Sequence, residues 1–152
     1  MRLIELISNY LKKPDFTSTG RIYLAALSKL GKDASPNDLV PDDVACTETL
    51  TTLLHELWPQ IPVMTGTWTF WEYMKYSNLF QRTYFPKQGS IIISPTGTGN
   101  GKLKNGHVGI CGEVDMIISN DSPTGMLLEN YTQRSWKQRY GDFGGFKIEF
   151  FN

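Results

Sequence analysis

The sequence has no excess of charge of either sign. Its fifteen basic side chains balance its fifteen acidic ones, and neither kind forms a long run. Proteins that bind nucleic acid or an acidic membrane surface by electrostatics carry a basic patch or a basic segment. The composition therefore argues against nucleic acid as a partner and against a polybasic membrane anchor.

The chain also lacks a long apolar segment. Nowhere do roughly eighteen apolar residues follow one another, as a membrane-spanning helix requires. The apolar stretch at positions 1–8 is short and contains Glu5, which is unlike a secretory signal. We therefore expect no membrane insertion, and synthesis in the cytoplasm without a signal peptide. A role outside that compartment would require lysis or dedicated export.

Cysteine and histidine are scarce, and they show neither CxxC nor HExxH spacing. The four residues are Cys46, His55, His107 and Cys111. Without such spacing we expect no metal site. A cytoplasmic protein seldom keeps a lone disulfide, so we also expect both thiols to be free. The glycine-rich segment 97–106 lacks the spacing of a phosphate loop, so we expect no cofactor and interpret this segment as a mobile loop.

A chain of 152 residues with 40% hydrophobic content is long enough to bury the core of a single domain, residues 1–152. Apolar residues at helical spacing come first and alternating or β-branched residues follow, which predicts an α+β fold with N-terminal helices on an antiparallel sheet. Helices are predicted over 2–12, 17–31, 42–58 and 65–80, and strands over 90–94, 107–111, 116–120, 126–131 and 146–150.

The predicted helix over 42–58 carries a cysteine near its start. Leucines at 50, 53, 54 and 57 form its apolar face, and Asp42 or Asp43 is a suitable N-cap. Cys46 would then lie in the first turn, where free N–H groups and the helix dipole favour a thiolate and can hold an oxyanion. The alternative is that Cys46 is a small buried apolar residue.

His107 opens the first strand of a predicted hairpin. If an even number of residues connects the strands, His107 pairs directly with Asn120 on the same face. A loop of three or five residues would place Ser119 or Asp121 there instead. We expect Asp121 to cap the Ser-Pro turn that follows it, so Asn120 is the expected partner of the histidine.

These residue types are the parts of a Cys-His-Asn hydrolase. Cys46 would attack a carbonyl, His107 would take and return the proton, and Asn120 would orient the imidazole. The other histidine, His55, lies about 13 Å from Cys46 along the same helix, at 1.5 Å per residue. Cys111 lies about 13 Å from His107 along the same strand. Neither is therefore expected to act in the site.

Three segments resemble the NlpC-type and CHAP-type cysteine peptidases. They are Ala45-Cys46 opening a helix, Pro86-x-x-Gly89-Ser-Ile-Ile-Ile, and Gly106-His107-Val108-Gly109-Ile110. The resemblance covers about residues 40–121 and implies a papain-like fold. It also implies hydrolysis of an amide bond in peptidoglycan, within the stem peptide or cross-bridge or between sugar and peptide, through an acyl-enzyme.

Small enzymes of this kind are similar to phage endolysins and bacteriolytic effectors. The resemblance therefore implies peptidoglycan or its stem peptides as the partner, a monomer, and an immunity protein or a holin acting alongside. Two other functions stay open. One is a papain-like protease, deamidase or acyltransferase acting on a protein or lipid. The other is a non-catalytic phage structural or binding module in which Cys46 and His107 are core residues.

Aromatic residues are dense between positions 68 and 85. We expect most of them to build the core. One or two of them are candidates to line a groove for a sugar or a peptide.

Overall fold

The computed structural model describes residues 17–35, 39–41, 44–101 and 103–152. The helix predicted over 2–12 lies outside these residues, as do Asp42 and Asp43. The helices are α2 (Ser18–Lys29), α3 (Cys46–Leu57), α4 (Thr67–Tyr76), α5 (Gln133–Trp136) and the π-helix η2 (Lys137–Phe143). The strands are β1 (Arg82–Thr83), β2 (Ile91–Ser94), β3 (His107–Cys111), β4 (Met116–Asn120), β5 (Leu127–Thr132) and β6 (Glu149–Phe151).

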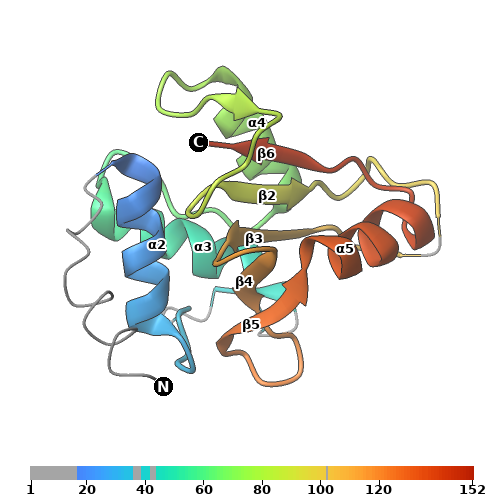
Figure 1. The fold of residues 1–152 in the computed structure, drawn as a ribbon, viewed down its shortest axis with the longest axis horizontal. Helices are drawn as coiled ribbons and strands as arrows, with labels where there is room; N and C mark the ends of the chain where they lie inside the picture. The colour runs from blue at the N-terminus through green and yellow to red at the C-terminus, as the bar shows by residue number, and fades with distance from the viewer. Residues whose placement is uncertain (1–16, 36–38, 42–43, 102) are drawn as a thin grey trace.

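The strands form one antiparallel sheet in the order β1-β6-β2-β3-β4-β5. The C-terminal strand β6 pairs with both β1 and β2 and so lies inside the sheet. Figure 1 shows α2 and α5 at opposite ends of the sheet. The α+β class is therefore confirmed. Among the described residues, no helix combines the length and the apolar character of a membrane span.

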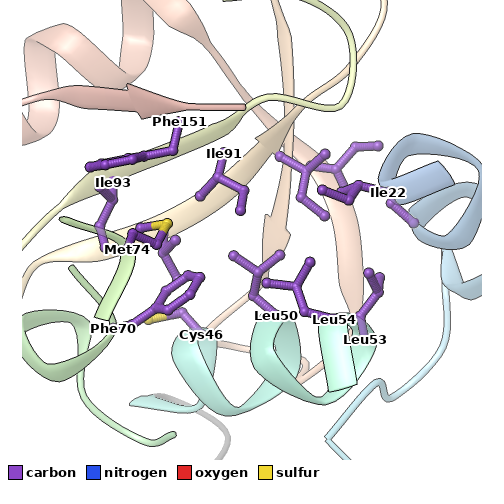
Figure 2. Packing of buried hydrophobic residues seen from close by; sticks show 14 of the residues in the cluster. Ile22, Cys46, Leu50, Leu53, Leu54, Phe70, Met74, Ile91, Ile93 and Phe151 are labelled. Atoms are coloured by element: carbon purple, nitrogen blue, oxygen red, sulfur yellow. The ribbon is translucent and has the colours of Figure 1, made fainter. Parts of the chain in front are cut away.

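The two faces of the sheet pack against different elements. One face packs on α3 and α4, and Figure 2 shows Leu50 and Leu54 of α3 pointing at it. The other face carries Ile92, which packs with Trp136 of α5 and with η2. Successive strand residues point to opposite faces, which separates the two clusters. Each fully buried leucine contributes about 1.5–3 kcal/mol to stability.

The beginning of α3 differs from the prediction. The helix starts at Cys46 itself, and its N-cap is Ala45, which makes no side-chain cap hydrogen bond. The residues predicted to cap the helix, Asp42 and Asp43, lie outside the described residues. The carboxylate of Glu48, in the first turn, instead accepts the backbone N–H groups of Leu39 and Val40 at 3.0 and 3.2 Å. This contact ties the preceding segment to the helix.

Helix α2 begins as predicted but buries a different stripe. The Thr17 hydroxyl accepts from the N–H of Gly20 at 3.2 Å and caps the helix. Tyr23 is buried, but Leu24 and Leu27 are 43% and 39% exposed. The helical spacing of Tyr23, Leu24, Leu27 and Leu30 predicts that all four face inward, but of these only Tyr23 is buried.

The β3–β4 hairpin has an odd connection, so the predicted register is wrong by one residue. Gly109 pairs with Ser119, and the N–H of Gly112 donates to the carbonyl of Met116 at 2.7 Å. Residues 113–115 form the connection, with Val114 at a φ of 54°. In this register Ser119 lies on the same face as His107, because side chains two positions apart share a face. Asn120 lies on the opposite face.

A β-bulge interrupts the pairing of β4 with β5. Ile118 pairs with Glu129, but Ile117 pairs with Tyr131, so Asn130 is an extra residue in β5. Because of the bulge, Asn130 and Tyr131 both project to the face that carries Ser119. Asn130 and Tyr131, although consecutive in the chain, therefore both lie near His107.

Candidate active site

Cys46 and His107 line one cavity of about 510 Å³. Its walls come from the start of α3, the start of α4, the loop that precedes β3, and η2. Cavities of this size accommodate small-molecule or short peptide segments. Cys46 is 8% exposed and His107 is 6% exposed, so both lie at the bottom of the cavity rather than at its rim.

Two threonine hydroxyl groups hold the segment that leads into His107. The Thr67 hydroxyl accepts from the N–H of Thr96 at 2.8 Å, and the Thr96 hydroxyl accepts from the N–H of Gly106 at 2.9 Å. Gly106 also has no room for a side chain, because a Cβ there would lie 1.9 Å from the carbonyl oxygen of Ser94. These contacts connect α4, β2 and β3 at the position of the histidine.

The Cys46 thiol has a pKa above its usual value. Burial raises the pKa, while hydrogen bonds from the Thr47 side chain and from the backbone of Val108, Thr47 and Cys46 lower it by a smaller amount. The helix N-terminus was expected to favour the thiolate, and the raised pKa of Cys46 contradicts this expectation. Removal from water outweighs the helix contribution, because a charged form loses its solvation.

The His107 imidazole is enclosed by aromatic rings. It stacks on Trp136 and Tyr140, with centroids 5.1 and 5.4 Å away, and Tyr131 meets it edge-on at 5.8 Å. Burial and, to a smaller extent, the nearby positive charge of Arg139 together lower the pKa of His107 to about 3. His107 is therefore neutral near pH 7, as is the Cys46 thiol.

A chain of two hydrogen bonds determines which nitrogen of His107 carries the proton. Nε2 lies 2.9 Å from the Ser119 hydroxyl, which in turn donates to Oδ1 of Asn130 at 2.6 Å. Since the hydroxyl has one proton and gives it to Asn130, it accepts from Nε2–H of His107. The lone pair of the neutral ring is then on Nδ1, which is the nitrogen available as a base.

Asn120, the predicted orienting residue, does not contact His107 in this way. Its Oδ1 accepts from the Thr49 hydroxyl at 3.4 Å, on the face that packs against α3. The odd hairpin loop explains this difference. Asp121 caps the following turn, accepting from the Thr124 hydroxyl at 2.7 Å, as predicted.

The sheet lies between the two main side chains. His107 pairs with Ser94, whose hydroxyl accepts from Trp136 Nε1 at 3.0 Å, so His107 faces the aromatic cluster. Cys46 belongs to the core on the opposite face. They line the same cavity because His107 is the first residue of β3, at the end of the strand. Among the hydrogen bonds of the described residues, none joins the Cys46 sulfur to the ring.

The remaining cysteine and histidine lie elsewhere. Cys111 is buried in the cluster with Trp136, its burial raises its pKa to about 12, and both thiols are free. His55 is exposed at the end of α3, and its Nδ1 lies 2.7 Å from the carbonyl oxygen of Ile61. Neither residue lines the cavity.

The aromatic residues between positions 68 and 85 are divided between the core and the surface. Phe70 and Trp71 are buried in the core, and Trp71 donates to the Glu149 carboxylate at 2.7 Å. Trp68 is different, because it is 45% exposed and lines the cavity. The expectation that most of these aromatic residues build the core is met by Phe70, Trp71, Tyr73 and Phe80, whereas Tyr76, Tyr84 and Phe85 are exposed.

Several site residues were not found from the sequence. They are Asn130, Tyr131, Trp136, Arg139 and Tyr140. The segment around Asn130 reads as an ordinary strand, and nothing in its composition marks a bulge. The spacing of Trp136 and Tyr140, four residues apart, is the one signal that places two aromatic rings on the same side of a helix.

No protein-family model matches this sequence, and no curated protein matches it. Among the described residues, no three His, Cys, Asp or Glu side chains gather in a way that would hold a metal ion. The site is therefore interpreted from its own geometry.

Proposed function

We propose that the chain is a papain-like cysteine hydrolase that cleaves an amide bond of bacterial peptidoglycan. The observation that carries the proposal is the ordered His107–Ser119–Asn130 chain at a cavity that Cys46 also lines. Acyl transfer uses a histidine held in one tautomer together with a cysteine nucleophile, and here both line one cavity, with the cysteine at a helix start.

The reaction starts from a neutral pair. As the Cys46 sulfur attacks the carbonyl carbon, its proton passes to Nδ1 of His107, and the carbonyl becomes an oxyanion. The N–H groups at the start of α3 are suited to hold that oxyanion. Ser119 keeps accepting from Nε2–H while the ring is charged.

Collapse of the intermediate breaks the C–N bond. The proton on Nδ1 passes to the leaving amine, and the acyl group stays on Cys46 as a thioester. Water then attacks the thioester, gives its proton to Nδ1, and releases the acid as the sulfur takes the proton back. Atoms and charges balance without a metal or cofactor.

The choice of substrate rests on the resemblance of the segments around Cys46 and His107 to wall-degrading peptidases. The cavity is open enough for a peptide segment, and Trp68 offers an exposed ring on which a sugar or peptide can pack. Peptidoglycan presents both groups next to its amide bonds.

The test is digestion of purified wall sacculi, with the released fragments analysed by mass spectrometry. Wild-type protein should generate new amine and carboxyl termini, and Cys46→Ala and His107→Ala should each lose activity by several orders of magnitude, because nucleophile and base act as a unit. His55→Ala is the control and should retain the rate.

The same digestion separates the other functions. If no new termini appear but the protein cleaves an amide of a protein or lipid, and this activity needs Cys46, then the same site acts on a different substrate. Full activity of Cys46→Ala would eliminate the mechanism.

A further inference from the structure

The described residues that line the cavity include two cations and no carboxylate. The cations are Lys104, in the loop before β3, and Arg139, in η2. Among the salt bridges of the described residues, none involves either side chain. A concave site with unpaired positive charge attracts anions and concentrates the field between its low-dielectric walls.

Arg139 is held beside the reacting groups through Tyr140. The guanidinium hydrogen-bonds to the Tyr140 hydroxyl and lies 5.6 Å from the centroid of its ring. The Tyr140 ring in turn stacks on His107. The positive charge is therefore oriented next to the imidazole.

The charge of Arg139 acts against protonation of His107. Ser119, Tyr131, Trp136 and Tyr140 also face the ring, from β4, β5, α5 and η2, and all four are uncharged. Arg139 is the charged group that acts on His107. An imidazolium must form when Cys46 gives up its proton, and a neighbouring cation disfavours it.

We propose that Arg139, with Lys104, binds a carboxylate of the substrate, and that this anion offsets the repulsion between Arg139 and the imidazolium. The inference rests on the proposed function and narrows its substrate class to amides with a free carboxylate close to the scissile bond. The carboxylate of the bound substrate then balances the positive charge of the site. An analogue in which a carboxamide replaces this carboxylate is a poor substrate.

Binding is tested apart from turnover with the full chain carrying Cys46→Ala. N-acetylglycine and N-acetylglycinamide, which differ only in a carboxylate, are titrated and followed by NMR. N-acetylglycine should bind at least about fivefold more tightly, as expected of a partly exposed charge-assisted contact. The ring nitrogens of His107 should also titrate at higher pH when it is bound.

Arg139→Gln should reduce the preference for the carboxylate to less than about twofold, since it removes the charge but keeps the length of the side chain. Arg134→Gln is the matched control, because Arg134 is an exposed arginine of α5 outside this cavity and should keep the preference. Equal affinity for the two probes, no binding of either, or an unchanged preference in Arg139→Gln would overturn the inference.

The outcomes distinguish this inference from the function on which it rests. If the protein binds the carboxylate probe selectively but does not digest wall sacculi, the anion site is supported and the proposed reaction is contradicted. If digestion requires Cys46 but the protein shows no preference for the carboxylate probe, the hydrolase is supported and the anion site is contradicted.

Discussion

At the scale of single residues, the state of protonation decides how the site works. Burial raises the pKa of Cys46 and lowers that of His107, so both groups are neutral near pH 7. A helix N-terminus alone would have suggested a preformed thiolate. The loss of solvation raises the pKa of Cys46 by more than the helix N-terminus lowers it. The proton of the Cys46 thiol is therefore expected to move to His107 only as the substrate reacts.

This state predicts slow alkylation of Cys46 by iodoacetamide at neutral pH. A raised pKa means that the reactive thiolate accumulates only above the usual thiol value of about 8.5. Cys111→Ala isolates the signal of Cys46, and the rate is measured as a function of pH. Rapid labelling with an apparent pKa below that value would show that the thiolate is favoured after all.

Ser119 and Asn130 are predicted to be positioning residues. Ser119→Ala should slow turnover by roughly ten- to a thousandfold while leaving measurable activity, because it removes the acceptor that holds Nε2–H. Asn130→Ala removes a contact that lies one hydrogen bond further from His107, so it should slow turnover less than Ser119→Ala does. ¹⁵N chemical shifts of His107 should show mixed tautomers in Ser119→Ala.

Asn120→Ala serves as the comparison, because Asn120 lies on the α3 face. It is expected to change stability but not the tautomer of His107. A rate loss in Asn120→Ala larger than that in Ser119→Ala would contradict the assignment of Ser119.

At the scale of elements, one hairpin and one bulge assemble the site. The odd β3–β4 connection places Ser119 rather than Asn120 on the face of His107. The bulge in β5 then brings Asn130 and Tyr131 to that same face. A change of one residue in either feature would turn these side chains away, since strand side chains alternate between faces.

Gly109 is the point where this arrangement is tightest. A Cβ there would lie 2.8 Å from Cγ2 of Ile117, 2.9 Å from the carbonyl oxygen of Ile118 and 3.2 Å from Cβ of Ser119. Gly109→Ala should therefore destabilise the protein by about 1–3 kcal/mol, as overpacking does. It should also slow turnover, because Ser119 is displaced.

Chemical denaturation and the rate of wall digestion measure these two effects. Gly112→Ala is the control in the same hairpin, where the nearest atom would lie 3.3 Å away, so its effect should be smaller. Equal stability of wild type and Gly109→Ala would show that the strands move apart at little cost.

At the scale of the whole molecule, the sheet separates an apolar core on the α3 face from an aromatic cluster on the other. His107 is buried in the second cluster, and the protein therefore carries a buried neutral histidine. Folding removes this imidazole from water, where it would readily take up a proton, so stability depends on pH.

The sign of that dependence follows from the lowered pKa of His107, about 3 in the folded protein against 6.5 as the usual value. Above about pH 6.5 both states are neutral at this position, and its contribution to stability is fully present. As pH falls toward 3, the unfolded chain binds the proton and the folded protein does not. Stability should drop by an amount on the order of a few kcal/mol.

Urea midpoints measured across this pH range test the prediction, with His107→Gln as the control. The variant cannot titrate at this position, so its midpoint should fall less steeply with acidification. Parallel curves for the two proteins would show that His107 is accessible to protons in the folded state.

The sequence by itself determined the features that depend on local pattern. Leucines at helical spacing predicted α3, β-branched and alternating residues predicted β2 and β4, and the spacing along one helix predicted that His55 lies away from Cys46. These signals come from periodicity within one element, which is set by backbone geometry. The same signals identified Cys46 and His107 as candidates.

The tertiary structure alone decided which residues meet. Hairpin register depends on how the connection folds, so the sequence left Ser119 as one of three alternatives. A bulge depends on packing across strands, so nothing in the sequence pointed to Asn130. Burial likewise decided the charge state of Cys46, because desolvation is a property of the assembled core and not of a helix terminus.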